Sequence, residues 1–206
     1  MLNIYASESN PKQVQDMIKR IARMAEYREP LMYSHIERMR GYTSVIASAI
    51  GLTKQAAEMI CISSQLHDVG KIGLPDEIIM KSDKLSPYEM EVMKRHPSIG
   101  AELLKDSPSV ILQAGALIAF THHERWDGSG YPRGISKEDI PLSGRICGVC
   151  DVFDALITKR SYKTDISFDD AVQLIKEEAG RLFDPRVVEV FVENKEQILK
   201  VYNSLA

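Results

Sequence analysis

The chain has 206 residues, a length that fits one domain with a substantial buried core. Hydrophobic residues make up 44% and charged residues 27%, the balance of an ordinary soluble globular protein. The formal net charge of -3 gives no overall attraction to DNA or to acidic membranes, so an anionic substrate would need a local site, such as one made by bound metal cations.

The sequence shows no signal for export or membrane insertion. No stretch approaches the roughly 20 continuous apolar residues of a membrane span, and the first residues lack the basic start and apolar run of a signal peptide. The three cysteines, Cys61, Cys147 and Cys150, lack the spacing of a disulfide framework. We therefore expect reduced thiols and a cytoplasmic location. We interpret Cys147 and Cys150 as buried small hydrophobes, because a zinc site would need a second pair.

A first helix is predicted near the N-terminus. Asn10 and Pro11 form a typical cap and first turn, apolar residues recur at helical spacing as far as Ala25, and Pro30 ends or bends the helix. The apolar stripe fits two interpretations equally well: a helix packed on its own domain, or a signalling or dimerisation helix. We assign residues 1–30 to an N-terminal helical segment or linker.

Helical signals continue along the rest of the chain. Ser86, Pro87 and Glu89 form a capping box, Ser167 and Asp184 are further caps, and residues 127–134 are too rich in glycine and proline to continue a helix. No segment alternates convincingly like a strand. We therefore predict an all-α fold, with helices over residues 31–50, 54–68, 86 onward, 111–123, 143–159, 167 onward and 184–203.

Five histidines occur, and some of them lie in clusters with other ligand types. His67 and Asp68 end an apolar helix, and His122, His123 and Glu124 close another directly before the glycine-rich loop. Imidazole nitrogens and carboxylate oxygens are the ligands that hold iron, manganese or zinc, and helix ends that face a common cavity can gather them. A lone histidine usually has an ordinary structural role, but these clusters favour a metal site.

The adjacent ligands raise a geometric question. Neighbouring residues on a helix point about 100° apart, so His122 and His123 cannot both bind one metal from a straight helix. A helix end that breaks into a loop removes this restriction, and so do two neighbouring metals. The same argument applies to His67 and Asp68, whose carboxylate can bridge two ions. The spacing by itself is only a weak indication of a dinuclear site.

Several motifs, taken in order, resemble one family. His67-Asp68-Val69-Gly70-Lys71 with Pro75-Asp76 resembles the signature of HD-domain metal phosphohydrolases, and residues 122–132 resemble the extended motif of the HD-GYP subgroup. The resemblance continues through residues 96–100, 141–146, 151–156 and 183–185, so that it covers about residues 31–200. It implies an HD-domain helical bundle with a GYP loop and a C-terminal helical extension, in which residues 31–206 form the catalytic domain.

The resemblance also implies a chemistry. HD-GYP proteins bind two or three metals, commonly iron or manganese, and hydrolyse cyclic di-GMP to pGpG or onward to GMP by means of a metal-bridging hydroxide. By similarity Asp68 would bridge the metals, Lys71 would lie near the scissile phosphate as a catalytic and substrate-binding residue, and Arg38 would face the substrate. The implied metal ligands are His35, His67, Asp68, His96, His122, His123 and Asp151.

Other polar and aromatic residues near the motifs have two interpretations each. Arg125 is a candidate contact for phosphate or guanine, and an ordinary exposed loop position fits it equally well. Trp126 fits the anchoring of the loop better than stacking on a base. Asp127 and Asp154 are expected to cap or orient neighbouring groups rather than to bind metal directly.

One departure from the family pattern decides the predicted number of metals. Members with three metals usually carry an acidic residue four positions before the first histidine ligand, so that both face the site from one helix. That position here is Leu31, and Glu29 stands two residues earlier, on the other side of Pro30. We therefore predict two divalent metal ions, iron or manganese, rather than three.

Two alternatives to cyclic di-GMP hydrolysis stay open. The same chemistry can act on another cyclic dinucleotide, 3′,3′-cyclic GMP-AMP, because base selectivity depends on the shape of the pocket. The second alternative is a catalytically weak nucleotide-binding signalling module. As partners beyond the substrate, the family resemblance suggests a GGDEF-type cyclase at the GYP loop, and we also consider a homodimer; we expect neither DNA nor a membrane span.

Overall fold

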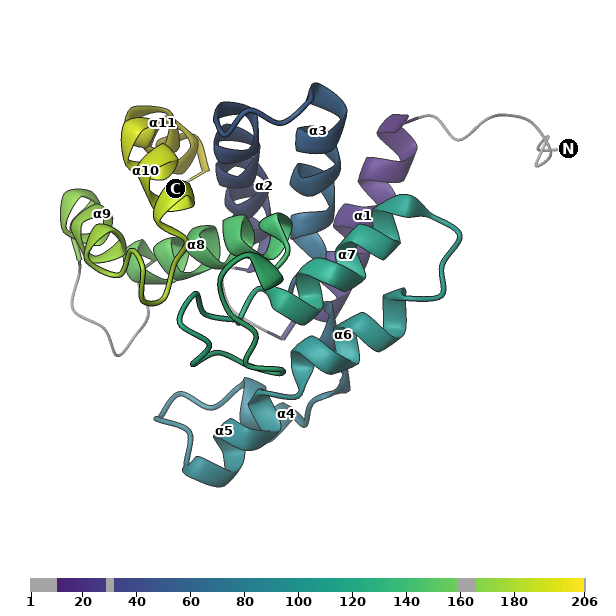
Figure 1. Ribbon diagram of the computed structural model, residues 1–206. Helices are drawn as coiled ribbons and strands as arrows, with labels where there is room; N and C mark the ends of the chain where they lie inside the picture. Colours follow the sequence, from purple (N-terminus) through teal and green to yellow (C-terminus); the bar gives the residue numbers. More distant parts are fainter. Residues whose placement is uncertain (1–10, 29–31, 159–165, 206) are drawn as a thin grey trace, which may run out of the picture.

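The computed structural model describes residues 11–28, 32–158 and 166–205, and every regular element in these ranges is helical. One isolated bridge, between Ala179 and Phe183, is the sole β-type pairing within them. The prediction of an all-α fold is therefore confirmed. In chain order, the α-helices and the 3₁₀-helices η1 to η3 are α1 (Pro11–Ala25), α2 (Met32–Ala49), α3 (Lys54–Ser63), η1 (Ser64–Leu66), η2 (Val69–Gly73), α4 (Asp76–Ile79), α5 (Pro87–Met93), α6 (His96–Leu104), α7 (Val110–Thr121), η3 (Lys137–Asp139), α8 (Leu142–Ile157), α9 (Phe168–Glu177), α10 (Pro185–Glu193) and α11 (Lys195–Leu205) (Figure 1).

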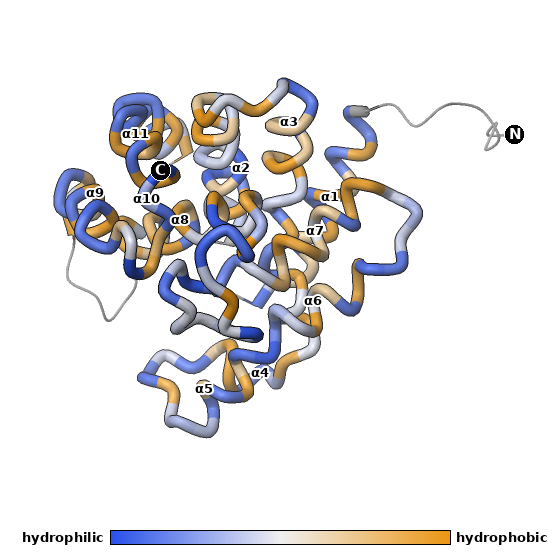
Figure 2. The backbone as a smooth tube through the Cα atoms, in the orientation of Figure 1, coloured by the Kyte–Doolittle hydropathy of each residue, from blue (hydrophilic) through white to orange (hydrophobic). Residues whose placement is uncertain are grey.

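The larger hydrophobic cluster lies where α2 and α8 meet the C-terminal helices α9, α10 and α11 (Figure 2). Tyr42 of α2, Phe153 of α8 and Phe191 of α10 are fully buried there. The ring of Phe153 makes T-shaped contacts with the other two at centroid distances of 5.5 and 4.9 Å. Such edge-to-face pairs contribute about 0.5–1.5 kcal/mol beyond the burial of their area. This cluster holds α8 in place, and α8 carries Asp151 and Asp154.

The helix α1 packs against the same body of helices. Its residues Ile18, Ala22 and Ala25 are buried with Ile36 of α2 and Leu66 of η1 in a second hydrophobic cluster. Their spacing is the amphipathic pattern seen in the sequence. For this helix the structure shows the first of the two interpretations, a helix packed on its own domain. α1 ends at Ala25, and the predicted stop at Pro30 falls in residues 29–31, outside the described part of the chain.

The helix predicted over residues 54–68 is shorter than expected. It stops as α3 and tightens into η1, because the Ser64 hydroxyl donates to the carbonyl oxygen of Cys61 within the last turn. The prediction of one helix up to Asp68 is therefore wrong. The correction matters for function, because His67 and Asp68 follow the end of the helical segment and are not constrained to helical spacing.

The last predicted helix is two helices. The segment predicted to run on to residue 203 breaks at Asn194, whose side-chain amide donates to the Val190 carbonyl oxygen and separates α10 from α11. Three of the predicted helix starts are confirmed. Ser86 forms the expected capping box at α5, and Ser167 and Asp184 are the N-caps of α9 and α10. Boundary errors of this kind do not alter the arrangement of the core.

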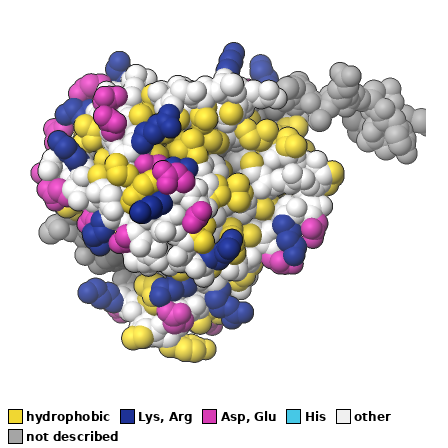
Figure 3. All heavy atoms as spheres, in the orientation of Figure 1, with side chains coloured by type: hydrophobic (Ala, Val, Ile, Leu, Met, Phe, Trp, Pro, Cys, Tyr) yellow, Lys and Arg dark blue, Asp and Glu magenta, His cyan; other side chains and the backbone are white. Residues whose placement is uncertain are grey.

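Three further expectations about the chain can be compared with the structure. Cys147 and Cys150 are fully buried on α8, which confirms their role as small hydrophobes. Residues 127–134 form an irregular loop after α7, as predicted. Among the described helices, none combines the length and the apolar character needed to cross a membrane. On the face drawn in Figure 3, charged side chains of both signs are interspersed, in keeping with the small net charge.

The segment after His67 is pressed against α6. A Cβ atom added to Gly70 of η2 would collide with the carbonyl oxygen of His96 and with the backbone nitrogen of Gly100. Only glycine fits at this position, because the atoms in the way belong to the backbone and not to a flexible side chain. The contact sets the spacing between Asp68, two residues before Gly70, and His96 at the start of α6.

Replacing Gly70 with Ala should lower the free energy of unfolding by about 3 kcal/mol, the upper end of the usual cost of overpacking. Gly73→Ala in the same 3₁₀-helix is the matched control, because its added Cβ would meet only the side chain of Ile99, at 3.0 Å. We expect the control to stay within about 1 kcal/mol of the wild type. Urea unfolding followed by circular dichroism measures both variants, and equal losses would contradict a special role for the contact at Gly70.

Candidate metal centre

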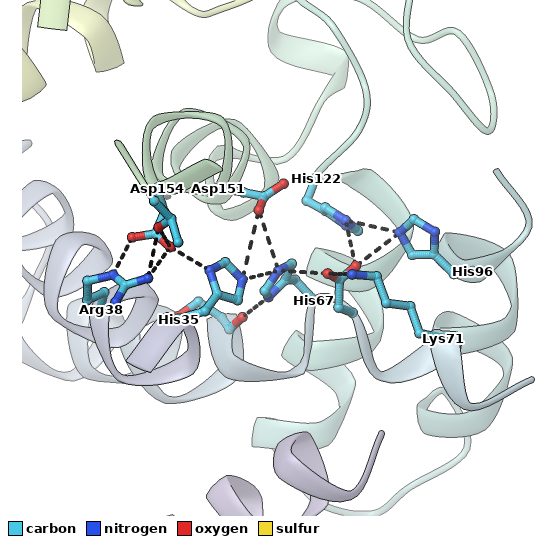
Figure 4. A network of polar contacts seen from close by, with 11 residues as sticks. His35, Arg38, His67, Lys71, His96, His122, Asp151 and Asp154 are labelled. Atoms are coloured by element: carbon cyan, nitrogen blue, oxygen red, sulfur yellow. Dashed lines mark hydrogen bonds and ion pairs between the residues drawn. The ribbon is translucent and has the colours of Figure 1, made fainter. Parts of the chain in front are cut away.

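The residues implied as metal ligands all converge on one place in the fold. Figure 4 shows His35, His67, His96, His122 and Asp151 gathered there. They come from α2, from the turn between η1 and η2, from the start of α6, from the end of α7 and from α8. Most of them are buried, and the partly exposed ones are His35, His123 and Asp151. The structure thus brings together the whole implied set, although its members are far apart in the sequence.

The ligand atoms form two groups. In the first, which we call the His96 group, one ligand atom from each side chain lies within 4.8 Å of the others, and the members are Asp68, His96, His122 and His123. In the second, the His35 group, the same holds for His35, His67 and Asp151. A cation needs several ligands around a common point, and each group offers one such point.

Asp68 lies between the two groups. Its Oδ1 atom is 3.1 Å from Nε2 of His96 and 3.6 Å from Nε2 of His122. Its Oδ2 atom is 3.3 Å from Nε2 of His67. The carboxylate therefore presents one oxygen to each group, which is the arrangement expected of a ligand shared by two cations.

Backbone carbonyls hold the imidazole rings by their other nitrogen. The Nδ1 atom lies close to a carbonyl oxygen of the preceding turn, at 2.9 Å in His67, 2.8 Å in His96 and 2.9 Å in His122. A carbonyl oxygen only accepts, so each Nδ1 donates a proton there, and Nε2 is the ring nitrogen that faces the centre and can bind a cation. This is the tautomer that binds a cation through Nε2.

The adjacent histidines fit into one group because the helix ends beside them. His122 is the residue at which α7 ends, and His123 already belongs to the loop that follows. Their ring centroids are 4.0 Å apart, with the ring planes tilted by 40°. The helix α8 closes on this point, since a Cβ added to Gly148 would lie only 2.8 Å from the His122 carbonyl oxygen. The helix end thus removes the restriction that a straight helix would impose.

Asp154 holds the ring of His35. Its Oδ2 atom accepts a hydrogen bond from His35 Nδ1 at 2.8 Å, and Arg38 donates to the same carboxylate from Nε at 2.6 Å and from Nη2 at 2.8 Å. Burial raises the pKa of Asp154, but Arg38 and His35 lower it by more, to about 2, so the carboxylate stays ionised. The expectation that Asp154 orients a neighbouring group is confirmed.

Arg38 is engaged with the protein itself. The side chain is only 4% exposed, and Nη2 also donates to Oγ1 of Thr158 at 3.0 Å. Its planar guanidinium thus forms a bidentate pair with Asp154. This pairing leaves few N–H groups of Arg38 to bind another anion. This arrangement favours a supporting role, through Asp154 and His35, over the predicted contact with substrate.

Lys71 lies beside the shared ligand. Its Nζ atom is 2.6 Å from Oδ2 of Asp68. Burial raises the pKa of Asp68, but Lys71 and His67 lower it to well below its usual range, so the carboxylate is ionised and able to bind cations. The segment that carries Lys71 is held by Arg28, whose guanidinium donates to the carbonyl oxygens of Lys71 and Leu74. The sequence did not identify Arg28 as part of this support.

The loop after α7 is fixed to the body of the protein. The backbone N–H of Trp126 donates to the carbonyl oxygen of Leu182 at 3.1 Å, which supports the interpretation of Trp126 as an anchor. Asp127 accepts hydrogen bonds from the backbone N–H and the hydroxyl of Ser129, as expected of a capping residue. The guanidinium of Arg125 lies 5.7 Å from the centroid of the Phe183 ring. The contact of Arg125 with substrate stays a prediction.

One buried carboxylate of the site was not predicted. Glu26 follows α1 directly, is 2% exposed, and its Oε1 atom makes no hydrogen bond. One of its oxygens lies within 4.8 Å of ligand atoms of His35 and Asp68. Burial, with help from the charge of Asp68, raises the pKa of Glu26 to about 7, although His35 and Lys71 oppose the shift. A signal did exist in the sequence, because Glu26 stands one helical turn after Ala22 on the apolar face of the first helix.

These donors fit divalent cations. Asp68 Oδ1 and Glu26 Oε1 are buried oxygens without a hydrogen-bond partner. Burial lowers the pKa of His67, but Asp68 and Asp151 raise it by more, to about 10, so these surroundings favour positive charge. Imidazole nitrogens combined with carboxylate oxygens are typical of iron, manganese and zinc sites. The chain therefore carries a histidine–aspartate cluster suited to divalent metal.

Replacing Asp154 with Asn should weaken the binding of Mn²⁺ about 10- to 100-fold, the usual effect of removing a group that orients a histidine ligand. It should also lower the free energy of unfolding by about 3–5 kcal/mol, because Arg38 is left as a buried charge without its partner. Isothermal titration with Mn²⁺ at low temperature, where the variant is folded, measures the first effect, and urea unfolding measures the second.

The matched control is Thr158→Val. It removes the hydroxyl that bonds Arg38 and Asp154 but leaves the contact between Asp154 and His35 intact. This control should bind Mn²⁺ like the wild type. If Asp154→Asn bound Mn²⁺ as tightly as the control, the orienting role of Asp154 would be disproved.

Comparison with known proteins identifies relatives that match nearly the whole chain. The chain is 44% identical over 186 residues to a cyclic di-GMP phosphodiesterase response regulator of Xanthomonas campestris, which covers 90% of this chain and 49% of the relative. It is 38% identical over 190 residues to 3′3′-cGAMP-specific phosphodiesterase 2 of Vibrio cholerae, which covers 92% of this chain and 36% of the relative. The chain thus spans half or less of the length of these two relatives.

The fold and the family model agree with these matches. A solved HDG"Y"P protein of Bdellovibrio bacteriovorus superimposes with a TM-score of 0.64 at 18% identity, over 92% of this chain and 63% of that one, and so has the same fold. The family model described as HD domain matches residues 19–187. The chain therefore belongs to the HD-domain family and, by its ordered motifs, to the HD-GYP group within it.

Proposed function

We propose that this chain is the catalytic part of a metal-dependent phosphodiesterase that hydrolyses cyclic di-GMP to pGpG, to GMP or to both. One observation carries the proposal. Oδ1 of Asp68, which is ionised, faces Nε2 of His122 at 3.6 Å, although burial lowers the pKa of His122 and its ring proton lies on Nδ1. Two buried lone pairs at this distance repel each other unless a cation neutralises them.

We propose two cations, iron or manganese, one in the His96 group and one in the His35 group, with Asp68 as their shared ligand. The separation of the ligand atoms into these two groups supports the number. The mixture of imidazole and carboxylate donors supports either metal. When bound, such a pair of cations supplies Lewis acidity toward the phosphodiester and makes water a nucleophile at neutral pH.

The protein's own side chains would bind the phosphate and manage protons. Lys71 Nζ is held 2.6 Å from Asp68, so its ammonium can donate to a phosphate oxygen near the shared ligand and offset the charge that develops in the transition state. The same ammonium can give a proton to the departing 3′-oxygen of the ribose. Arg125, at the start of the loop after α7, is a further candidate for a contact with phosphate or guanine. Arg38 would act through Asp154 and His35.

Cyclic di-GMP is the first choice of substrate, and 3′,3′-cyclic GMP-AMP is the second. The higher identity to the relative named for cyclic di-GMP, 44% against 38%, supports this order. The two dinucleotides share the phosphodiester that the metal centre would attack, and they differ at one base. A nucleotide-binding module without catalysis has less support, because the complete set of ligands lies within one cluster.

Other expectations about the whole protein also remain proposals. We propose that the catalytic unit begins with α1 and not after residue 30, because α1 shares a buried cluster with α2 and η1. A GGDEF-type cyclase at the GYP loop and a homodimer rest on the family resemblance alone. The buried free thiols of Cys61, Cys147 and Cys150 fit the reducing cytoplasm as the place of action.

Anaerobic purification, followed by metal quantification and a turnover assay, tests the function. We expect two equivalents of iron or manganese per chain and hydrolysis of cyclic di-GMP, with the linear products separated by chromatography. The same preparation assayed with 3′,3′-cyclic GMP-AMP decides the substrate. Metal-loaded protein that binds cyclic di-GMP without hydrolysing it would contradict the enzyme and favour the signalling module.

Asp68→Ala should bring turnover below detection and reduce the metal content, because both groups lose the ligand that they share. Asp127→Ala is the matched control, since it also removes a carboxylate, but one that only caps Ser129 in the loop. The control should keep its metal and most of its activity. Metal quantification and the cyclic di-GMP assay compare the two variants, and retained turnover in Asp68→Ala would rule out the bridging role.

A further inference from the structure

We infer that Glu26 is an additional ligand of the cation in the His35 group, so that the helix α1 supplies part of the metal centre. The inference rests on the proposed metal-dependent function and concerns a residue outside the ligand set that the family resemblance implies. Glu26 is almost completely buried, and its Oε1 atom makes no hydrogen bond. One of its oxygens lies within 4.8 Å of a ligand atom of His35, a member of that group.

The position of the carboxylate is the first argument. One oxygen of Glu26, one nitrogen of His35 and one oxygen of Asp68 all lie within 4.8 Å of one another. Ligands on opposite sides of one small cation stand about twice the metal–ligand distance apart, or about 4–4.4 Å. The three atoms are therefore close enough to belong to the coordination sphere of one cation, together with donors already in the His35 group.

The protonation of His35 argues against a separate third cation. Nδ1 of His35 donates to Asp154 at 2.8 Å, so only Nε2 is left to bind metal. That nitrogen lies 3.9 Å from Oδ1 of Asp151 and 3.3 Å from Nε2 of His67, within the His35 group. One nitrogen lone pair binds one cation. A third cation beside Glu26 would therefore have to compete for Nε2 of His35 with the cation of the His35 group. If Glu26 instead binds the cation of the His35 group, Nε2 of His35 binds only that cation.

The packing of α1 is the second argument, because it aims Glu26 at the centre. The backbone N–H of Glu26 donates to the Ala22 carbonyl oxygen at 3.1 Å, which continues the last turn of the helix. Ala22 and Ala25 are buried against the core, and Lys19 on the same helix pairs with Glu37 of α2. The helix is therefore fixed in position and rotation. A buried carboxylate oxygen without a hydrogen-bond partner, such as Oε1 of Glu26, is costly, and a cation offsets that cost.

The test compares Glu26→Gln with the wild type. Gln has the same shape and can be buried without a charge, so the fold should be retained. We expect the wild type to bind two equivalents of Mn²⁺ and the variant to bind one of them about tenfold more weakly or worse, as metal sites do on losing a supporting group. Equilibrium dialysis with metal quantification measures this without any reference to activity. Amide hydrogen exchange in residues 11–25 should also slow on addition of Mn²⁺ in the wild type and much less in the variant.

Glu37→Gln is the matched control. It too removes a carboxylate, and it loosens α1 from α2 by breaking the ion pair with Lys19, but Glu37 is not part of either ligand group. The control should bind Mn²⁺ like the wild type. If the control lost affinity to the same extent as Glu26→Gln, the effect would come from the docking of α1 and the inference would be wrong.

The remaining outcomes separate this inference from the proposed function. Unchanged binding in Glu26→Gln, with two equivalents in both proteins, overturns the ligand role and leaves the proposed function standing. Three equivalents in the wild type and two in Glu26→Gln also overturn it, because Glu26 would then hold a cation of its own. A wild type that binds no divalent metal at all refutes the proposed function itself.

Discussion

The metal centre depends on one constraint, which is a buried carboxylate whose two oxygens face the Nε2 atoms of three imidazole rings. Oδ1 of Asp68 faces Nε2 of His96 and of His122, and Oδ2 faces Nε2 of His67. Lys71 compensates one of its oxygens, and the other has no hydrogen-bond partner. A buried charge that is not fully paired costs several kcal/mol, as a general estimate. Oδ1 is therefore an incompletely compensated buried oxygen whose favourable partner is a cation.

Unsatisfied carbonyl groups at helix ends maintain this arrangement. The last carbonyl oxygens of any helix lack a partner within it. His122 donates through Nδ1 to a carbonyl oxygen in the last turn of α7, and His96 donates to the carbonyl oxygen of Met93, the last residue of α5. His67 donates through Nδ1 to the carbonyl oxygen of Ser64 in η1, which also accepts the backbone N–H of His67. Carbonyl groups at helix ends thus orient the three ligands, and the rings of His96 and His122 provide donors to carbonyl oxygens near these ends in return.

The sequence predicted the helical class, most helix starts and the members of the ligand cluster. These features follow from local rules, such as the capping box at Ser86, or from ordered motifs such as the one that begins at His67. It did not predict the break at Asn194 or the early end of α3, because a side chain that bonds to the preceding turn competes with the helix there. It also did not show that Arg38 pairs with Asp154, because this pairing joins residues 116 positions apart.

Glu26 shows why a site cannot be read from motifs alone. Because position 31 is Leu and not an acidic residue, the sequence predicted two metals rather than three. The carboxylate of Glu26, nine residues before His35, nevertheless lies close to His35 and comes from another helix. What brings it there is the apolar face of α1, which is a packing feature and carries no chemical motif. A residue at the edge of such a face is buried because its neighbours are, and only the fold shows what it meets. Since a buried carboxylate beside Asp68 weakens the metal-free protein and strengthens the attraction for cations, the packing of α1 links the stability of the fold to the occupancy of the centre.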